Sequence, residues 1–152
     1  MDFAFIILTL TTTVTLLRDP VFGSPAGLEF SRELMWTNRY GSFDRLERAA
    51  FIVDRGNGEL ECLAWPATYL PDRATFDGGI PPATIAIIHT HPIRVPWPSR
   101  QDQIESRRLG IPIYALTPLS VMKAVPTQSE PVSVRRGRWL DPPPTQHRCK
   151  AL

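Results

Sequence analysis

The sequence predicts a single α/β (α+β) domain in which helices flank a mixed central β-sheet. Strand-like and helix-like segments alternate along the chain, and residues 84–88 form a nearly continuous apolar run. Such a run is typical of a central strand that is covered on both faces. A chain of 152 residues without internal repeats can bury one hydrophobic core without cross-links.

The segment before the first helix allows two interpretations. Residues 3–17 are uncharged and apolar but too short for a membrane-spanning helix. With Ser24-Pro-Ala26 behind them, residues 1–26 are compatible with a secretory signal, yet Asp2 stands where a signal carries a basic residue. A first core element is the favoured interpretation, so we expect a cytoplasmic protein, with export as the alternative. The domain itself is predicted to span residues 27–140.

The first elements are a helix and a hairpin. Proline is favoured at the first helical position, so a helix is predicted to begin at Asp19-Pro20 or Ser24-Pro25 and to end near Tyr40. Residues 48–53 and 59–65 are predicted to be strands, because the Asp-Arg-Gly-Asn-Gly sequence between them has the composition of a hairpin turn.

The second half of the chain supplies the remaining elements. A loop rich in proline and glycine, residues 66–82, leads into the apolar strand, and a short helix from Ser99 to Arg108 is expected to end at Gly110. Three further strands are predicted, at residues 111–116, 121–125 and 132–139. Residues 141–152 form a proline-rich polar tail, which we expect to fray.

Charge and cysteine content exclude several classes of protein. A net charge of +2 from 17 basic and 15 acidic residues gives no strong field for nucleic acid or an acidic membrane, and we expect neither as a partner. The basic sequence Arg135-Arg-Gly-Arg138 is predicted to lie on a solvated strand edge. Cys62 is predicted to be a small core residue and Cys149 to lie in the tail, so neither a disulfide framework nor a thiol nucleophile is expected.

The most informative motif follows the apolar strand. His89 and His91 are one residue apart, and in an extended strand both side chains lie on the same face. One metal ion can then contact both imidazoles at about 2.0–2.1 Å. Asp102, eleven positions after His91, can return through a short loop as a third ligand. Three protein ligands and an open fourth position describe a catalytic zinc site, so one Zn²⁺ per chain is expected.

Each part of this motif also has a purely structural interpretation. The histidines can be ordinary polar ends of a buried strand, and Ser99-x-x-Asp102 can be a helix start with Ser99 as its N-cap. Both interpretations can hold together, because a capped helix start is a rigid way to aim Asp102 at a metal. Trp97, on the loop before Ser99, either packs over a substrate or makes a satellite core contact. His147, in the tail, is not expected to be a ligand.

His89-Thr-His-Pro, six further residues, and Ser99-x-x-Asp102 together resemble the motif of the JAMM (MPN+) metallopeptidases, which are zinc isopeptidases found among deubiquitinases and their bacterial relatives. That family also has a glutamate before a hydrophobic strand, and Glu47 before Ala49-Ala-Phe-Ile-Val53 is similar. Glu59 and Glu61 are rivals for this role, but they alternate with apolar residues and are expected on a solvated strand face.

The resemblance, which extends from Glu47 to about Lys123, implies a JAMM/MPN-like domain with zinc at one edge of its sheet. It implies a zinc-dependent isopeptidase or peptidase that acts on the C-terminal tail of a ubiquitin-like protein or its conjugates. Glu47 would carry the proton from the attacking water to the leaving amine, and Ser99 would donate a hydrogen bond to the oxyanion. The alternatives are an exported metallopeptidase with another peptide substrate and a non-catalytic scaffold of the same fold.

Overall fold

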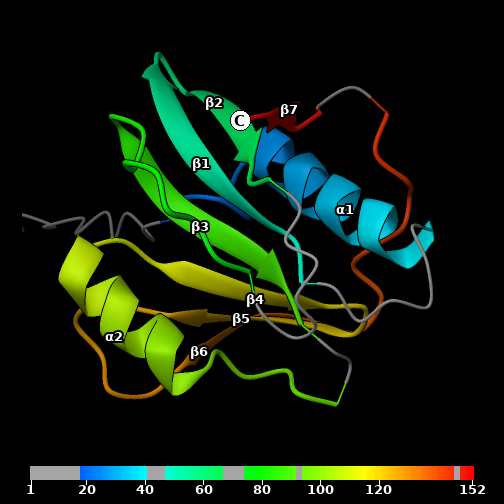
Figure 1. The fold of residues 1–152 in the computed structure, drawn as a ribbon. Coiled ribbons are helices and arrows are strands. Elements are labelled where there is room, and N and C mark those ends of the chain that lie inside the picture. Colours follow the sequence, from blue (N-terminus) through cyan, green and yellow to red (C-terminus); the bar gives the residue numbers. More distant parts are fainter. Residues whose placement is uncertain (1–17, 41–46, 67–73, 92–93, 146–147) are drawn as a thin grey trace, which may run out of the picture.

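A single mixed sheet organises the protein, whose computed structural model describes residues 18–40, 47–66, 74–91, 94–145 and 148–152. The elements in chain order are α1 (Pro25–Tyr40), β1 (Ala49–Gly56), β2 (Glu59–Ala64), β3 (Thr84–Thr90), α2 (Arg100–Leu109), β4 (Ile113–Thr117), β5 (Ser120–Ala124), β6 (Val132–Arg136) and β7 (Lys150–Ala151). The strands lie in the order β6-β5-β4-β3-β1-β2-β7 across the sheet (Figure 1). The predicted α/β architecture is therefore confirmed.

Local signals position the first three elements. Helix α1 begins at Pro25, and the Ser24 hydroxyl before it accepts a hydrogen bond of 3.0 Å from the Gly27 N–H, as an N-cap does. Strands β1 and β2 form the predicted hairpin. Asn57 and Gly58 turn the chain with positive φ angles of 53° and 78°, which a two-residue type I′ turn requires.

The central strand β3 joins the two halves of the sheet. It pairs antiparallel with β1 and parallel with β4, and the crossover between β3 and β4 contains α2. Strands β4 and β5 confirm the predicted pair. Strand β6 ends at Arg136 rather than near residue 139, because Trp139 turns into the core and its indole N–H donates to the Thr117 carbonyl at 2.7 Å. Arg135 and Arg136 are exposed on this outer strand, as predicted.

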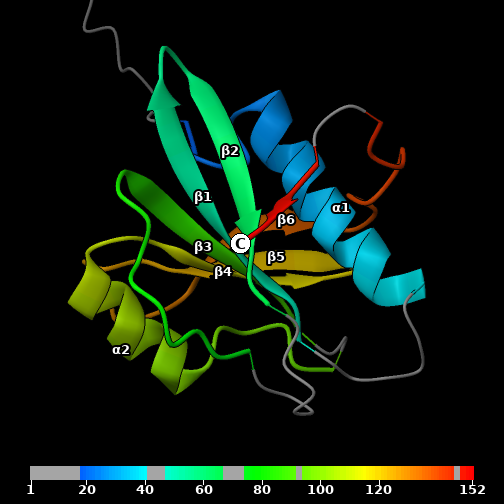
Figure 2. The same ribbon diagram turned by 45° about the horizontal axis from the view of Figure 1, so that its top comes forward.

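The two helices cover opposite faces of the sheet (Figure 2). Helix α1 contributes Phe30, Leu34 and Met35 to a core that alternate residues of the central strands complete, among them Ile52 and Ile88. The intervening residues of the same strands point the other way, as the period of two requires. On that second face a smaller cluster of Phe51, Val53, Ile87 and Ile113 packs against Leu109 of α2. The second face is therefore the less completely covered of the two.

The C-terminal tail corrects two predictions. Cys62 is buried as expected, but it forms a disulfide with Cys149, 87 residues away. Strand β7 then pairs parallel with β2, and the Lys150 ammonium contacts the Glu61 carboxylate at 2.7 Å. The expectation of a frayed end is therefore wrong for residues 148–152. These contacts join segments far apart in the chain, and no local periodicity signals them.

The described part of the N-terminal segment belongs to the domain. Val21 and Phe22 are buried in the core beside α1. The Asp19 carboxylate contacts the Lys123 ammonium at 2.8 Å and accepts a hydrogen bond of 2.9 Å from the Tyr114 hydroxyl. The folded domain therefore begins before the predicted boundary at residue 27. Residues 1–17 lie outside the described residues, and no described helix is long and apolar enough to cross a membrane.

Candidate metal centre

The two histidines lie at the end of β3 and share one face, as predicted. The side chains of His89 and His91 are buried, and their rings stand edge to face with centroids 4.5 Å apart. Thr90 between them points the other way, and its hydroxyl accepts a hydrogen bond of 2.9 Å from the Arg48 N–H. The His91 N–H donates to the Leu116 carbonyl at 2.8 Å. Neighbouring strands on both sides thus hold the backbone that carries the two imidazoles.

The start of α2 brings Asp102 to these imidazoles. Ser99 is the N-cap: its hydroxyl accepts the Asp102 N–H at 3.1 Å, while Asp102 Oδ2 accepts the Ser99 N–H at 2.6 Å. Asp102 Oδ1 lies 3.4 Å from His89 Nε2, and Oδ2 lies 3.9 Å from His91 Nε2. The predicted helix start is confirmed, and the same side chain faces both histidines.

Glu47, just before β1, faces the same pair of imidazoles. Its carboxylate oxygens lie 3.9 Å from His89 Nδ1 and 3.9 Å from His91 Nε2, and the Ala74 N–H donates to it at 3.3 Å. The rival glutamates are elsewhere: Glu59 is exposed, and Glu61 binds Arg55 and Lys150 on the β2 side of the sheet. Of the three glutamates, Glu47 alone is next to the histidines.

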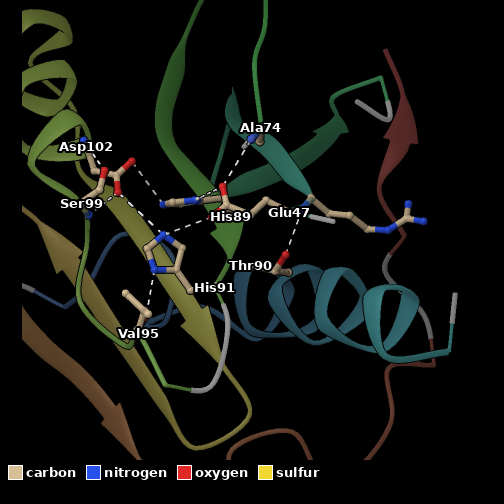
Figure 3. Close-up of polar contacts among 9 residues, drawn as sticks. Glu47, Ala74, His89, Thr90, His91, Val95, Ser99 and Asp102 are labelled. Carbon is tan, nitrogen blue, oxygen red and sulfur yellow. Dashed lines mark hydrogen bonds and ion pairs between the residues drawn. The ribbon is translucent and has the colours of Figure 1, made fainter. Parts of the chain in front are cut away.

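The spacing of these donor atoms is compatible with one metal ion. Two ligands of a tetrahedral zinc with bonds of about 2.0–2.1 Å are about 3.3–3.4 Å apart. Asp102 Oδ1 lies 3.4 Å from His89 Nε2, whereas Glu47 Oε2 lies 3.9 Å from the other ring nitrogen, Nδ1. An ion bound at Nε2 of His89 therefore has Asp102 as its nearer carboxylate, and an ion bound at Nδ1 has Glu47; both carboxylates lie 3.9 Å from His91 Nε2. Glu47, His89 and His91 form a group whose ligand atoms lie within 4.8 Å of one another. Figure 3 shows the His89 ring between the Glu47 and Asp102 carboxylates. Glu47, His89 and His91 can therefore hold one metal ion, and Asp102 lies outside this group, on the other side of the His89 ring.

One buried atom of the site lacks a partner. His89 Nε2 is inaccessible to water and makes no hydrogen bond with any described residue, although Asp102 is close. Buried polar atoms without partners are rare in folded proteins, and each calls for an explanation. His91 does have a partner, because its Nδ1 is 2.9 Å from the Val95 carbonyl. A carbonyl oxygen only accepts, so Nδ1 carries the proton and Nε2 of the neutral ring has a lone pair. Both Nε2 atoms are thus suited to bind a metal.

The electrostatics of the site favour a cation. Burial lowers the pKa of His89, but the Asp102 and Glu47 carboxylates outweigh it and raise the pKa to about 9. Burial raises the pKa of Asp102, yet His89 and the Ser99 cap lower it to about 2, and His89 and His91 likewise depress the pKa of Glu47. Burial and charged His89 lower the pKa of His91. At neutral pH two carboxylates therefore face one imidazolium, a net charge of −1.

The residues of the candidate metal centre line part of a large cavity. This cavity, of about 1360 Å³, lies between α2 and residues 74–80 and continues over the sheet to apolar side chains that include Phe51, Trp65 and Phe76. The sequence did not reveal this apolar part, because its members come from two strands and a loop whose contacts are long-range. Nor did it reveal the hydrogen bonds from Ala74 and to Val95, which are made by backbone atoms.

Trp97 and His147 are the two further residues that the sequence analysis considered. Trp97 is 57% exposed, so the interpretation as a satellite core contact is wrong, and a role over the substrate stays a prediction. His147 lies outside the described residues.

Comparison with known proteins gave no match: no family model, no curated protein and no solved structure is significantly similar to this chain. The class defined by the fold and site is thus a mixed α/β domain with a candidate His/His/carboxylate metal centre.

Proposed function

We propose that this protein is a zinc-dependent hydrolase of amide bonds, a peptidase or isopeptidase of the JAMM type. The observation that carries this proposal is the convergence of two imidazoles and two carboxylates at the end of β3, inside a cavity large enough for a polypeptide segment. Structural zinc sites are closed by four protein ligands, usually rich in cysteine, whereas catalytic sites combine histidine and carboxylate ligands in an accessible pocket.

The four polar side chains divide into ligands and a base. His89, His91 and Asp102 are the proposed ligands, and a zinc ion there would supply an activated water by lowering its pKa towards 7. Glu47 would accept a proton from the attacking water and return it to the leaving amine, a role typically worth about 10²–10⁴-fold in rate. Its depressed pKa keeps Glu47 ionised at neutral pH, as a base must be.

Ser99 has a second proposed role besides capping α2. Its oxygen accepts the Asp102 N–H, which leaves the hydroxyl proton free to be donated. Ser99 also lines the cavity beside the metal-binding residues. We therefore assign it the stabilisation of the oxyanion that forms as the amide carbonyl is attacked. Loss of one such donor costs about 10²–10³-fold in other hydrolases.

The substrate proposed first follows from the motif resemblance: the C-terminal tail of a ubiquitin-like protein or a conjugate of one. A second candidate, an exported metallopeptidase that acts on another peptide, is favoured by the Cys62–Cys149 disulfide. Structural disulfides persist mainly in oxidising compartments and are rare in the cytosol of most organisms. Presence of all four polar groups supports either enzyme over a non-catalytic scaffold.

Zinc content and hydrolysis test this proposal together. The protein should hold one zinc per chain, and a chelator should abolish cleavage of peptide and isopeptide substrates. Asp102→Ala should lose most of the zinc, whereas Glu59→Ala, which removes an exposed carboxylate from β2, should keep it. Full zinc occupancy in Asp102→Ala would remove Asp102 from the ligand set. Inactivity of the zinc-loaded protein on every substrate would favour the scaffold.

A further inference from the structure

We propose that the apolar end of the cavity is a specificity subsite that binds a bulky apolar side chain of a polypeptide substrate, within two residues of the cleaved bond. This inference rests on the proposed function, because the metal centre defines where the bond is cleaved. The subsite would give a substrate preference that the His/Asp motif does not predict, namely for phenylalanine or a similarly large apolar residue over glycine.

The register of the sheet sets the distance between the two ends. Ala49 on β1 lies opposite His89 on β3, and the next pair on the same face is Phe51 opposite Ile87. Two residues along a strand span about 7 Å, which is also the separation of alternate side chains in an extended peptide. Phe51 and Ile87 are themselves buried, 1% and 6% exposed, and the half-buried Trp65 and Phe76 pack against them. A substrate held at His89 therefore places a neighbouring side chain beside Trp65 and Phe76. The small side chain of Ala49 leaves room beside the metal-binding residues.

The floor and walls of the subsite are apolar. Phe51, Ile87 and Ile113 form a buried apolar base across three strands, and the half-buried side chains that pack against this base face the cavity. Trp65 and Phe76 form one wall, and their ring centroids are 5.1 Å and 5.0 Å from that of Phe51. Leu109 of α2 packs against the same cluster from the other side. A large apolar side chain in this space would contact aromatic and aliphatic groups on several sides.

Phe76 is held in its place by the loop that carries it. A Cβ atom added at Gly78 would lie 2.6 Å from the ring atom Cζ of Phe76, so the ring packs directly on the glycine backbone. The loop is thus shaped around this aromatic ring at the cavity wall.

Two buried atoms in this cavity lack partners. Among the described residues, the buried side-chain polar atoms without a hydrogen bond are His89 Nε2 and Trp65 Nε1, and both residues line the cavity. The metal accounts for the first. A backbone carbonyl of a bound peptide would give the second, an indole N–H, the acceptor that it lacks. A polypeptide therefore suits the apolar end better than a purely hydrocarbon ligand.

The charged side chains of α2 that line the cavity are paired, so they do not oppose the binding of an apolar side chain. Glu105 and Arg108 of α2 line the cavity but pair with each other at 2.6 Å. Arg94 also lines it and is exposed. The half-buried lining of Trp65, Phe76 and Leu109 carries no charge. Transfer of a phenylalanine side chain from water to such a site should raise kcat/KM about 10- to 100-fold over glycine.

Matched peptides test the preference directly. The zinc-loaded protein is given two series of peptides that differ only by phenylalanine or glycine at each of the two positions on either side of the cleaved bond, which mass spectrometry maps. At one of these positions phenylalanine should raise kcat/KM at least tenfold. Phe76→Ala should reduce that ratio, while Leu28→Ala, a half-buried leucine packed on the α1 face, should leave it unchanged. Equal rates for both series, or equal ratios in both variants, would overturn the subsite.

A binding measurement separates this inference from the proposed function. Capped peptides with central phenylalanine or glycine are titrated into zinc-loaded Glu47→Gln protein, and the Trp65 indole resonance is followed by NMR. Binding of the phenylalanine peptide at least tenfold tighter, with a shift of the Trp65 resonance, would support the subsite even if the unmutated protein cleaves nothing. Equal affinities, or no shift at Trp65, would refute the subsite even if hydrolysis is observed.

Discussion

The two faces of the sheet differ in how completely a helix and buried side chains cover them. On one face, the 16-residue helix α1 lies over the central strands, and fifteen buried apolar residues form a continuous core. On the other face, the 10-residue helix α2 packs against β4 and β5, and the buried cluster among the described residues has four members. The space that α2 does not cover holds the candidate metal centre and the cavity.

This difference indicates that one residue of a strand can stabilise the fold while the next residue contributes to the candidate site. Ile88 is fully buried in the α1 core, and His89, the next residue, points to the metal centre. Because side chains alternate along a strand, a substitution at one position leaves the other face largely intact. The comparison can therefore be tested by paired substitutions, one on each face.

The largest contrast is expected between His89 and Ile88. His89→Ala should lose zinc and hydrolysis while the protein stays folded. Ile88→Ala should cost about 2–5 kcal/mol in the free energy of unfolding and leave the folded fraction active and zinc-loaded. Zinc analysis, chemical denaturation and a turnover assay on both variants check this. If Ile88→Ala abolished the specific activity of folded protein, the separation of the two faces would be wrong.

Removal of the disulfide should affect stability and spare the metal centre. Cys62 belongs to the α1 core, away from the histidines, so replacing both cysteines by alanine should cost about 2–5 kcal/mol without loss of zinc. The midpoint of denaturation, compared with that of the oxidised and the reduced protein, measures the effect. Identical stability with and without the disulfide would show that this cross-link does not stabilise the fold.

The two helix caps give a closely matched pair. Ser99 caps α2 beside the metal centre, and Ser24 caps α1 on the opposite side of the sheet. Either substitution by alanine should cost about 0.5–2 kcal/mol. Ser99→Ala should also lower kcat about 10²–10³-fold with zinc retained, because it removes the oxyanion donor. Equal kcat values for both variants would remove Ser99 from the mechanism.

The smallest effect expected is the pH dependence of zinc binding. The pKa of His89 is raised to about 9, so the imidazole is protonated at neutral pH and zinc must displace that proton. Zinc affinity should therefore rise about tenfold per pH unit between pH 7 and 8.5, and level off above about 9. Calorimetry in buffers of different ionisation enthalpy should show about one proton released. Affinity independent of pH in this range would contradict a protonated His89.

Local signals made much of the site predictable from the sequence. The strand period places His89 and His91 on one face, and Ser99 with Asp102 is a capping pair within one helical turn. Glu47 is 42 residues from His89 and needed the additional pattern of a glutamate before an apolar strand. The Cys62–Cys149 disulfide and strand β7 depend on how the tail crosses α1, which no short segment encodes. The aromatic wall of the cavity was missed for the same reason.

The most direct test of the central claim is the zinc content and turnover of Glu47→Gln. Glu47 and Asp102 approach the same two histidines at 3.4–3.9 Å, and the proposed mechanism makes Asp102 the ligand and Glu47 the base. Glutamine keeps the size of Glu47 but cannot accept a proton. The variant should therefore fold, hold one zinc per chain and lose about 10²–10⁴-fold in turnover. Loss of the zinc would instead make Glu47 a ligand, and near-normal turnover with zinc bound would contradict its role as the base.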